Sequence, residues 1–308
     1  MNILHMKYAL EVAKCGSINK AAEVLLMNQP NLSRAIKELE ASLGVEIFTR
    51  SAKGMVPTPE GETFLGYANK ILRQVDELEG IFKKSMPVRK RFSISVPRAS
   101  YISEAFSNFS LSLSGKTDVE VFYKETNSQR AIKNILDADY KLGIIRYAEH
   151  FDKYYKEMLD SKNLTYELVT EFNYVLVMSE NSTLAGIENI KYSDLERHIE
   201  IAHADPFVPS LPFAEVKKEE LPDNISRRIF VFERASQFEL LSKNPETFMW
   251  VSPAPKDLLK RYGLIQRECG ENTRLYKDLI IHRKDYQLST LDDIFITELC
   301  KSKRKLFK

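Results

Sequence analysis

Residues 16–43 contain the pattern that most restricts the fold of this chain, two short amphipathic helices joined by a tight turn. Ser17 is placed to cap the first helix, because its hydroxyl can accept a hydrogen bond from an orphan backbone N–H one turn on. Asn28 can cap the second helix, and Pro30 falls in its first turn, where no N–H is needed. Aliphatic side chains at helical spacing then predict one buried face, made by Leu32, Ile36, Leu39 and Leu43.

The opposite face of the second helix is polar and basic. Such a helix fits the major groove of DNA, where Gln reads adenine, Arg reads guanine, and Arg or Lys grips phosphate. The alternative is an ordinary helix pair with a solvated polar face, and from the helix pair alone that alternative is the better one. The residues that the DNA hypothesis places at the duplex are Ser17, Asn28, Gln29, Pro30, Asn31, Ser33, Arg34 and Lys37.

The sequence after the helix pair favours the DNA hypothesis. Residues 45–50 and 56–58 bracket a short basic segment in which Gly54 supplies turn geometry, so a β-hairpin is expected. A basic hairpin beside a recognition helix is a wing. Arg50 and Lys53 are therefore added to the expected DNA contacts, at the backbone or in the minor groove.

Residues 6–73 resemble the N-terminal domain of the LysR-type transcriptional regulators. The matching positions are Gly16-Ser17, Ala21-Ala22-Glu23, Gln29-Pro30, Leu32-Ser33, Leu39-Glu40, Leu43-Gly44, Phe48 with Arg50, and Thr58-Pro59-Glu60-Gly61. The chain departs from the family at Ala9 and Ile18, where Phe is common, and at Asn28, where Ser or Thr is usual. The first two departures concern core packing, and the third concerns what the helix reads.

The charge distribution is consistent with a DNA-binding N-terminal part. Residues 1–91 contain 14 Lys and Arg against 10 Asp and Glu, whereas the remainder contains 31 against 33. The positive excess lies where attraction to phosphate requires it. Because the excess is small, tight binding should need more than one copy of the domain.

A long helix is expected to supply the second copy. Thr58, Pro59 and Glu60 form a strong helix start, and no proline interrupts the chain from there to about Lys84. Two apolar series with a period of seven residues predict a dimerisation seam, composed of Phe64, Ala68, Ile71, Val75, Leu78 and Phe82. The alternative is a helix packed on its own domain. A polar hinge follows at residues 85–91.

An α/β pattern begins after residue 91, with strands and helices alternating as in βαβ units with a parallel sheet. Strands are expected at residues 92–96, 119–123, 142–145, 174–178, 200–202, 229–232, 248–251 and 279–281, and helices at 100–113, 129–136 and 288–303. The resemblance implies a two-lobed effector domain similar to a periplasmic binding protein. The expected domains are a winged helix-turn-helix (1–58), a linker helix and hinge (59–90), and an effector-binding domain (91–308) with lobe I at 91–165 and 267–308 and lobe II at 166–266.

A ligand site is expected where strands end, because ligands in such sheets lie beyond the carboxyl ends of the strands. That rule nominates Ser100, Tyr101, Thr126, Asn127, Ser128, Arg146, His203, Trp250 and Ser252. Hydroxyls and backbone N–H groups at helix starts suit an anion, which makes an anionic effector one candidate. The alternative for each Ser, Thr or Asn is simple helix capping, which Ser100 is placed to do. Arg146 is expected to pair either with an anionic effector or with a neighbouring acid.

Other classes of protein are less well supported. The sequence lacks the metalloprotease, nucleophile-elbow and phosphate-loop motifs, so neither an enzyme nor a cofactor or metal site is expected. Cys15, Cys269 and Cys300 are read as reduced structural thiols, with redox sensing as an alternative. A solute-binding protein would share the two lobes, but it would need an export leader and would have no winged helix. We expect a cytoplasmic, nucleoid-associated protein without a membrane helix.

The sequence thus predicts a homo-oligomer, with a tetramer preferred over a dimer, on an interrupted A/T-rich palindrome. Arg34 and Lys37 would hold the duplex while Asn28, Gln29 and Ser33 read bases. A small effector would close the two lobes and change promoter bend and access of RNA polymerase, a candidate partner. The effector must bind one arrangement better than the other for this to work.

Overall fold

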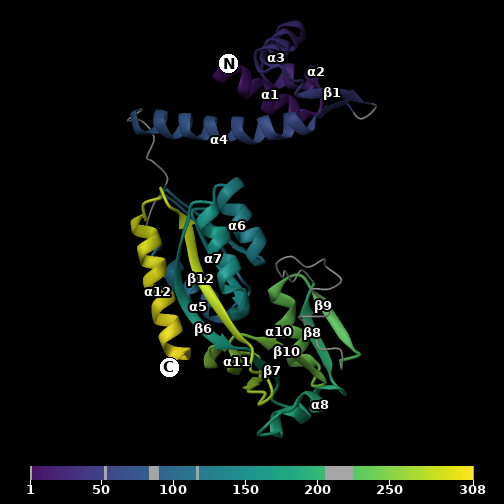
Figure 1. The fold of residues 1–308 in the computed structure, drawn as a ribbon, viewed down its shortest axis with the longest axis vertical. Coiled ribbons are helices and arrows are strands. Elements are labelled where there is room, and N and C mark those ends of the chain that lie inside the picture. Colours follow the sequence, from purple (N-terminus) through teal and green to yellow (C-terminus); the bar gives the residue numbers. More distant parts are fainter. Residues whose placement is uncertain (1, 52–53, 83–89, 116–117, 205–224, 308) are drawn as a thin grey trace. The chain divides into compact units, whose positions relative to one another are not determined.

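The computed structural model of the protein describes residues 2–307, apart from 52–53, 83–89, 116–117 and 205–224. The chain forms two compact units, Met1–Val88 and Arg89–Lys308, each of which is described by itself (Figure 1). None of the helices in the described ranges is both long enough and apolar enough to cross a membrane.

The first unit contains the predicted helix pair and hairpin. Its elements are α1 (Ile3–Cys15), α2 (Ile18–Val24), α3 (Gln29–Leu43), β1 (Phe48–Ser51), β2 (Gly54–Pro57) and α4 (Pro59–Phe82). The aliphatic side chains of α3 that the sequence assigned to one face pack with α1 and α2 in a single core, composed of Ala9, Val12, Ile18, Ala21, Ala22, Leu32, Ile36, Leu39, Ile47 and Phe48. Burial of this stripe fixes which face of α3 remains exposed.

Close backbone contacts attach the hairpin to the helices. The Met55 N–H donates to the Gly16 carbonyl across 2.9 Å, in the loop between α1 and α2. Gly54 has φ +106°, and a Cβ there would lie 2.4 Å from the Gly16 oxygen, so only glycine fits. Glu40 of α3 accepts hydrogen bonds at Oε1 from the N–H groups of Ile47 (2.8 Å) and Phe48 (3.2 Å). The hairpin therefore has a fixed position beside α3.

Helix α4 begins as predicted, because the Gly61 N–H donates to the Thr58 hydroxyl across 2.9 Å. Its first turns pack on the unit's own α1. The buried cluster between them contains Met6, Ala68 and Leu72, with Leu10, Phe64 and Ile71 packed against it. The first half of the predicted seam is thus buried within one chain. For these residues the structure agrees with the alternative, in which the helix packs on its own domain.

The second half of the predicted seam is more exposed. Val75 is half-buried and Leu78 is 56% exposed, and Tyr67 is also an exposed aromatic side chain on this helix. The side chain of Phe82 and residues 85–89 of the predicted hinge lie outside the described residues, and residues 90–91, which were also assigned to the hinge, belong to strand β3 (Lys90–Val96). An exposed apolar surface therefore remains on α4 in the part of the chain that is described.

The second unit begins with a five-stranded mixed sheet in the order β4-β3-β5-β12-β6 (Figure 1). The strands are β3 (Lys90–Val96), β4 (Val119–Glu125), β5 (Leu142–Ala148), β6 (Leu164–Asn173) and β12 (Leu275–Arg283). Helices α5 (Ser100–Leu111) and α12 (Thr290–Leu306) share one core with the sheet. On the other face, α6 (Ser128–Asp137), the short η1 (Glu149–Phe151) and α7 (Asp152–Ser161) cover the sheet. We call this sheet and its helices lobe I.

A second five-stranded sheet, in the order β11-β7-β10-β8-β9, forms lobe II. Its strands are β7 (Val175–Ser179), β8 (Ile199–His203), β9 (Arg228–Val231), β10 (Thr247–Val251) and β11 (Leu264–Arg267). Helices α10 (Arg234–Lys243) and α11 (Lys256–Arg261) share one core with this sheet. The short η2 (Thr183–Gly186) and α8 (Tyr192–Leu195) lie in a second core.

All the expected strands are present. Strands β6 and β11 were not expected, and the boundary between the lobes differs from the sequence prediction. β6 pairs antiparallel with β12 along its length, so lobe I continues to Asn173 instead of ending at residue 165. β6 is the edge of its sheet and mixes exposed Glu with buried Val and Phe, so it lacks the apolar run of a buried strand. β12 and β7 run antiparallel to their neighbours, so neither sheet is fully parallel as expected.

Candidate nucleic-acid interface and interlobe site

The face of α3 away from the core carries the predicted DNA contacts. Asn28, Pro30, Asn31, Arg34 and Lys37 are exposed, and Gln29 and Ser33 are half-buried. Arg50 projects from β1 and is also exposed, whereas Lys53 lies outside the described residues. The helix therefore presents amide, hydroxyl and guanidinium groups together, which is the chemistry that reads base edges.

The two predicted helix caps have different outcomes. Ser17 caps α2 as expected, accepting a hydrogen bond from the Lys20 N–H across 3.4 Å. Asn28 occupies the N-cap position of α3, but its side chain makes no capping bond, so that prediction was wrong. Pro30 removes one N–H that a cap would bind, and the Asn31 N–H donates to the Asn28 carbonyl at 3.0 Å instead. The exposed Asn28 amide remains available to a ligand.

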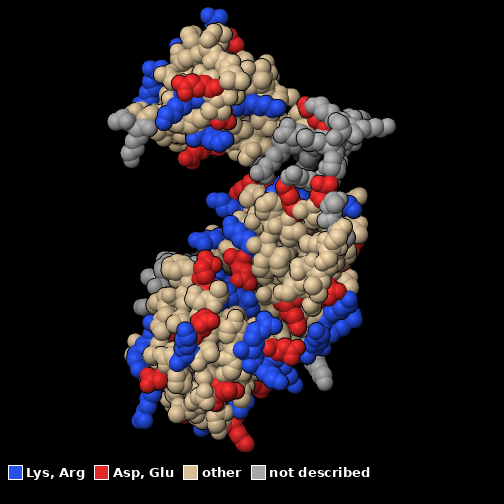
Figure 2. Space-filling model, turned by 180° about the vertical axis from the view of Figure 1, so that it is seen from behind, with Lys and Arg blue, Asp and Glu red and all other residues tan. Residues whose placement is uncertain are grey.

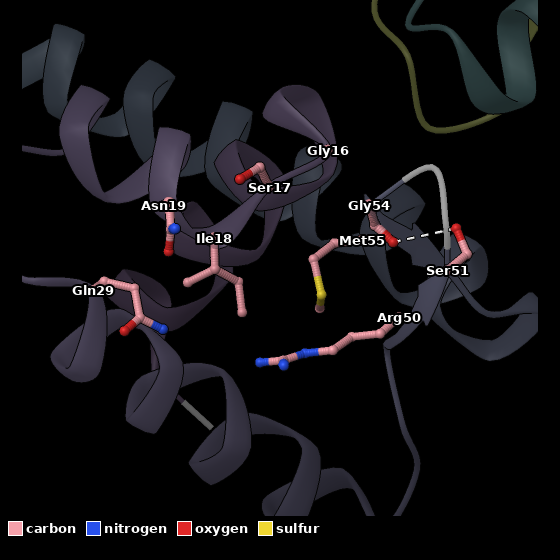
Figure 3. A pocket seen from close by; sticks show the side chains of 9 residues that line it. All are labelled: Gly16, Ser17, Ile18, Asn19, Gln29, Arg50, Ser51, Gly54 and Met55. Atoms are coloured by element: carbon pink, nitrogen blue, oxygen red, sulfur yellow. Dashed lines mark hydrogen bonds between the residues drawn. The ribbon is translucent and has the colours of Figure 1, made fainter.

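A pocket of about 270 Å³ lies between the start of α2, the start of α3 and the hairpin (Figure 3). Its lining residues are Gly16, Ser17, Ile18, Asn19, Gln29, Arg50, Ser51, Gly54 and Met55. The guanidinium of Arg50 and the amide of Gln29 point toward its centre from opposite sides (Figure 3). The pocket thus combines a cation, an amide and the first residues of two helices, a set that suits a phosphate oxygen.

Comparison with known proteins identifies the N-terminal domain. The helix-turn-helix family described as bacterial regulatory helix-turn-helix protein, lysR family, matches residues 3–62. These residues are a LysR-type helix-turn-helix domain. The chain is 41% identical over 98 residues to an uncharacterized HTH-type transcriptional regulator, YcgK of Bacillus subtilis, a match that covers 32% of this chain and 30% of that protein.

Two further relatives match a part of the chain of similar length. BenM of Acinetobacter baylyi is 37% identical over 94 residues, 30% of this chain and 31% of that protein. The nitrogen assimilation regulatory protein nac of Escherichia coli is 35% identical over 79 residues, 26% of each chain. The matched segments thus span about a third or less of each of these relatives.

Solved structures extend the similarity of fold to the whole chain. CbnR in complex with its target DNA covers 98% of this chain and all of that chain, at 19% identity and a TM-score of 0.61. A single-residue variant of full-length OxyR of Pseudomonas aeruginosa covers 100% of this chain and 96% of that chain, at 14% identity and a TM-score of 0.57. The fold of an N-terminal helix-turn-helix followed by an α/β part is therefore shared with full-length LysR regulators.

The two lobes of the second unit meet at the carboxyl ends of their strands. Arg234, at the start of α10 in lobe II, donates from Nη2 to the Ser100 hydroxyl of lobe I across 2.9 Å. Its Nη1 lies 3.8 Å from Glu125 Oε1, at the end of β4. The Thr126 N–H, donating to the Val96 carbonyl, joins the ends of β4 and β3. Ser100 and Thr126, both predicted ligand residues, are therefore neighbours at this junction.

Two other predicted ligand residues, Tyr101 and Arg146, belong to the interior of lobe I. Arg146 donates from Nε and Nη2 to both carboxylate oxygens of Asp278, across 2.7 and 2.6 Å. Tyr101 donates its hydroxyl to Asp278 Oδ2 across 2.5 Å, and the Arg146 guanidinium stacks over Phe172. Arg146 thus pairs with a neighbouring acid, the second of its two expected roles. Burial raises the pKa of Tyr101 well above its ordinary value, and the Asp278 charge adds to this.

Two of the remaining predicted ligand residues, Asn127 and Ser128, have local backbone partners. Asn127 caps α6 by accepting from the Arg130 N–H, and Ser128 exchanges hydrogen bonds with the backbone of Arg146. Ser100 is the first residue of α5, after an Ala99 N-cap, so its expected capping role was wrong. His203 is half-buried at the end of β8, Ser252 is buried just after β10, and Trp250 packs beside Tyr192.

Sequence reasoning missed Arg234 and Glu125 at the interlobe junction. A signal was present, because Arg234 follows the expected strand at 229–232 almost directly, and the rule for carboxyl ends of strands applies there too. Gln237 is one helical turn further along α10 and is 3% exposed. These residues join the candidate interlobe site, while Tyr101 and Arg146 leave it.

Two of the three cysteines have a thiol with a raised pKa. Burial raises the pKa of the Cys15 thiol, and its hydrogen bond to Glu11 adds to that effect. Burial also raises the pKa of Cys269. A raised pKa disfavours the thiolate that a redox sensor needs. In the described part of the chain, no group of three or more His, Cys, Asp and Glu side chains could hold a metal ion.

Proposed function

We propose that the chain is a sequence-specific DNA-binding transcriptional regulator of the LysR type, controlled by a small effector bound between lobes I and II. The observation that carries the proposal is the exposed α3 face beside a fixed wing, in a domain that matches the LysR family over residues 3–62. The similarity of fold to CbnR, whose structure contains its target DNA, supports DNA as the partner of this chain. Neither a solute-binding protein nor a cysteine-based sensor is favoured.

On this proposal Gln29, Ser33 and Asn28 read base edges, while Arg34 and Lys37 hold the duplex or read guanine. Arg50 and the α2 start grip a phosphate in the pocket of Figure 3. On the face shown in Figure 2, Lys and Arg are interspersed with Asp and Glu, as the net charge of +2 requires. Binding must therefore depend on a few placed side chains and on multiple copies instead of a large positive field.

Oligomerisation would supply those copies. The exposed Leu78 and Tyr67 of α4 form the apolar surface on which a second copy of this helix can pack. Two α3 helices held by such a pair would read half-sites about one DNA turn apart, in an interrupted A/T-rich palindrome. A dimer of dimers, contact with RNA polymerase and a cytoplasmic, nucleoid-associated location complete the proposal, which includes no catalytic step.

The effector part of the proposal is supported by the junction of the two lobes. Ser100, Thr126, Arg234 and Ser252 lie at or just beyond the carboxyl ends of strands from both sheets, where ligands of α/β folds bind. An effector that contacts both lobes prefers one relative placement of the lobes. Such a ligand shifts the population between two arrangements of the oligomer on DNA.

Selection of duplexes from a random pool by the full-length protein tests the DNA part of this proposal. The proposal predicts enrichment of a two-fold symmetric sequence with half-sites separated by about one helical turn. Arg50→Gln should weaken binding to all duplexes and reduce its salt dependence, because that side chain is assigned to phosphate. Recovery of an unenriched pool would refute sequence-specific binding.

A further inference from the structure

Arg234, on α10 of lobe II, contacts lobe I at two places, the start of α5 through a hydrogen bond and the end of β4 through an ion pair. Among the described residues, no other side chain of α10 has a hydrogen bond or ion pair to both places. The Arg234 side chain is only 12% exposed, and its guanidinium lies over the Phe238 ring at 4.9 Å. A buried guanidinium at the junction of two sheets would be expected to use its five N–H groups fully. Its actual bonds leave that capacity unfilled.

The unfilled capacity is specific. Arg234 Nε is buried and has no hydrogen-bond partner in the part of the chain that the structure describes. The Nη1 atom lies 3.8 Å from Glu125 Oε1, which is an ion pair but too long for a hydrogen bond. The Nε–H and one Nη2–H of a guanidinium are parallel on one edge, so a carboxylate can accept both, as Asp278 does from Arg146. On Arg234 that edge contains the unpartnered Nε.

Two more buried polar atoms in lobe II lack partners within the described ranges. Gln237 Oε1 belongs to a side chain 3% exposed, one turn after Arg234 on the same helix. Ser252 Oγ belongs to a side chain 1% exposed, just beyond the carboxyl end of β10. A buried amide oxygen accepts but cannot donate, so a ligand that satisfies it must carry an N–H or O–H group.

The charges at the junction limit the charge of the ligand. Glu125 accepts a hydrogen bond from the Tyr123 hydroxyl at 3.3 Å and lies beside Arg234. Arg98 and Glu233 contribute further charges of opposite sign to this carboxyl group's surroundings. Because Arg234 is already paired with Glu125, a dianion would be repelled by the Glu125 carboxylate more strongly than a monoanion, so a single negative charge is favoured.

We propose that Arg234 is the anion receptor of the interlobe site and that the effector is a small monocarboxylic acid bearing a hydroxyl or amino group. This inference rests on the proposed function, because it specifies the ligand of the same junction. The ligand's carboxylate binds the Nε–Nη2 edge of Arg234, and its hydroxyl or amino group donates to Gln237 Oε1. The Nη2 atom also donates to the Ser100 hydroxyl.

Thermal denaturation of the full-length protein tests this inference. The probes are a panel of α-hydroxy and α-amino monocarboxylic acids, their neutral amides and the matching dicarboxylic acids. All probes are used at the same concentration, in the millimolar range. At least one monocarboxylic acid should raise the Tm of the wild type, and its amide should not. Arg234→Gln should lose that shift. Lys243→Gln is the matched control, since it removes one positive charge from the exposed end of the same helix and should keep the shift.

The outcomes separate this inference from the function on which it rests. If no monocarboxylic acid raises the Tm, if the amides act equally, or if Arg234→Gln keeps the full shift, the inference is wrong. If Glu125→Gln abolishes the shift for amino acids but not for hydroxy acids, the ammonium group contacts Glu125 and its assignment to Gln237 Oε1 is wrong. Binding to selected duplexes, measured on the same proteins, tests the proposed function separately, because Arg234 lies outside the first unit.

Discussion

Glu40 fixes the wing to the recognition helix, and its removal should loosen the wing by a calculable amount. Oε1 accepts two backbone hydrogen bonds, from Ile47 at 2.8 Å and from Phe48 at 3.2 Å. A hydrogen bond to a charged group contributes about 1.5–3 kcal/mol. The side chain is half-buried and water can reach its neighbours, so the lower value of about 1.5 kcal/mol applies to each bond. Loss of both bonds in Glu40→Ala should therefore cost about 3 kcal/mol locally.

Hydrogen exchange measured by mass spectrometry on peptides covering residues 45–51 reports this loss directly. A cost of about 3 kcal/mol should accelerate exchange of the two amides by about 100-fold. Glu40→Gln keeps an acceptor oxygen without the charge, so roughly a 10-fold acceleration is expected. Glu38→Gln makes the same charge change at an exposed position of the same helix and should leave exchange unchanged. Wild-type exchange in Glu40→Ala would refute this account of the wing.

Three further predictions concern other parts of the molecule. Asp278→Asn leaves the buried Arg146 guanidinium without its carboxylate partner, so the free energy of unfolding should fall by about 3–5 kcal/mol. Urea denaturation followed by the fluorescence of the single Trp measures this loss, and an unchanged midpoint would contradict the prediction. Burial raises the pKa of Glu125, so the contribution of this carboxyl group to stability is present at low pH and is lost as pH rises through its folded-state pKa. The Tm of Glu125→Gln should therefore rise relative to the Tm of the wild type between about pH 4 and about pH 7. A difference in Tm that does not change with pH would argue against this prediction. Leu78→Asp should weaken dimerisation, measured by sedimentation velocity, without lowering the Tm. Gln74→Asp, at another exposed position of α4, should leave both dimerisation and the Tm unchanged. Identical sedimentation of the two variants would contradict the α4 interface.

The sequence predicted the first unit well because its signals are local. The Ser17 cap, the Pro59 helix start and the spacing of Leu32 and Ile36 each depend on neighbours within a turn or two. The failed cap at Asn28 was also local in cause, since Pro30 withdraws an N–H that the cap would bind.

The second unit was predicted less completely because its contacts join distant segments. Arg146 finds its partner Asp278 only because β12 returns beside β5, 132 residues later. The amphipathic edge strand β6 carries no buried apolar run, so its pairing with β12 was invisible in the sequence. Arg234 was missed for the same reason, since its significance depends on the approach of lobe I to the start of α10.

The ratio of affinities for a selected duplex and a scrambled duplex, at fixed physiological salt, tests the central claim most directly. If Arg34 contacts a base edge, Arg34→Ala should cost about 1–3 kcal/mol on the selected duplex, while binding to the scrambled duplex changes little, so the ratio falls. Arg34 is exposed on α3, so the domain should stay folded. A wild-type ratio near one would contradict the account of a sequence-reading helix, and an equal loss on both duplexes would contradict base reading by Arg34.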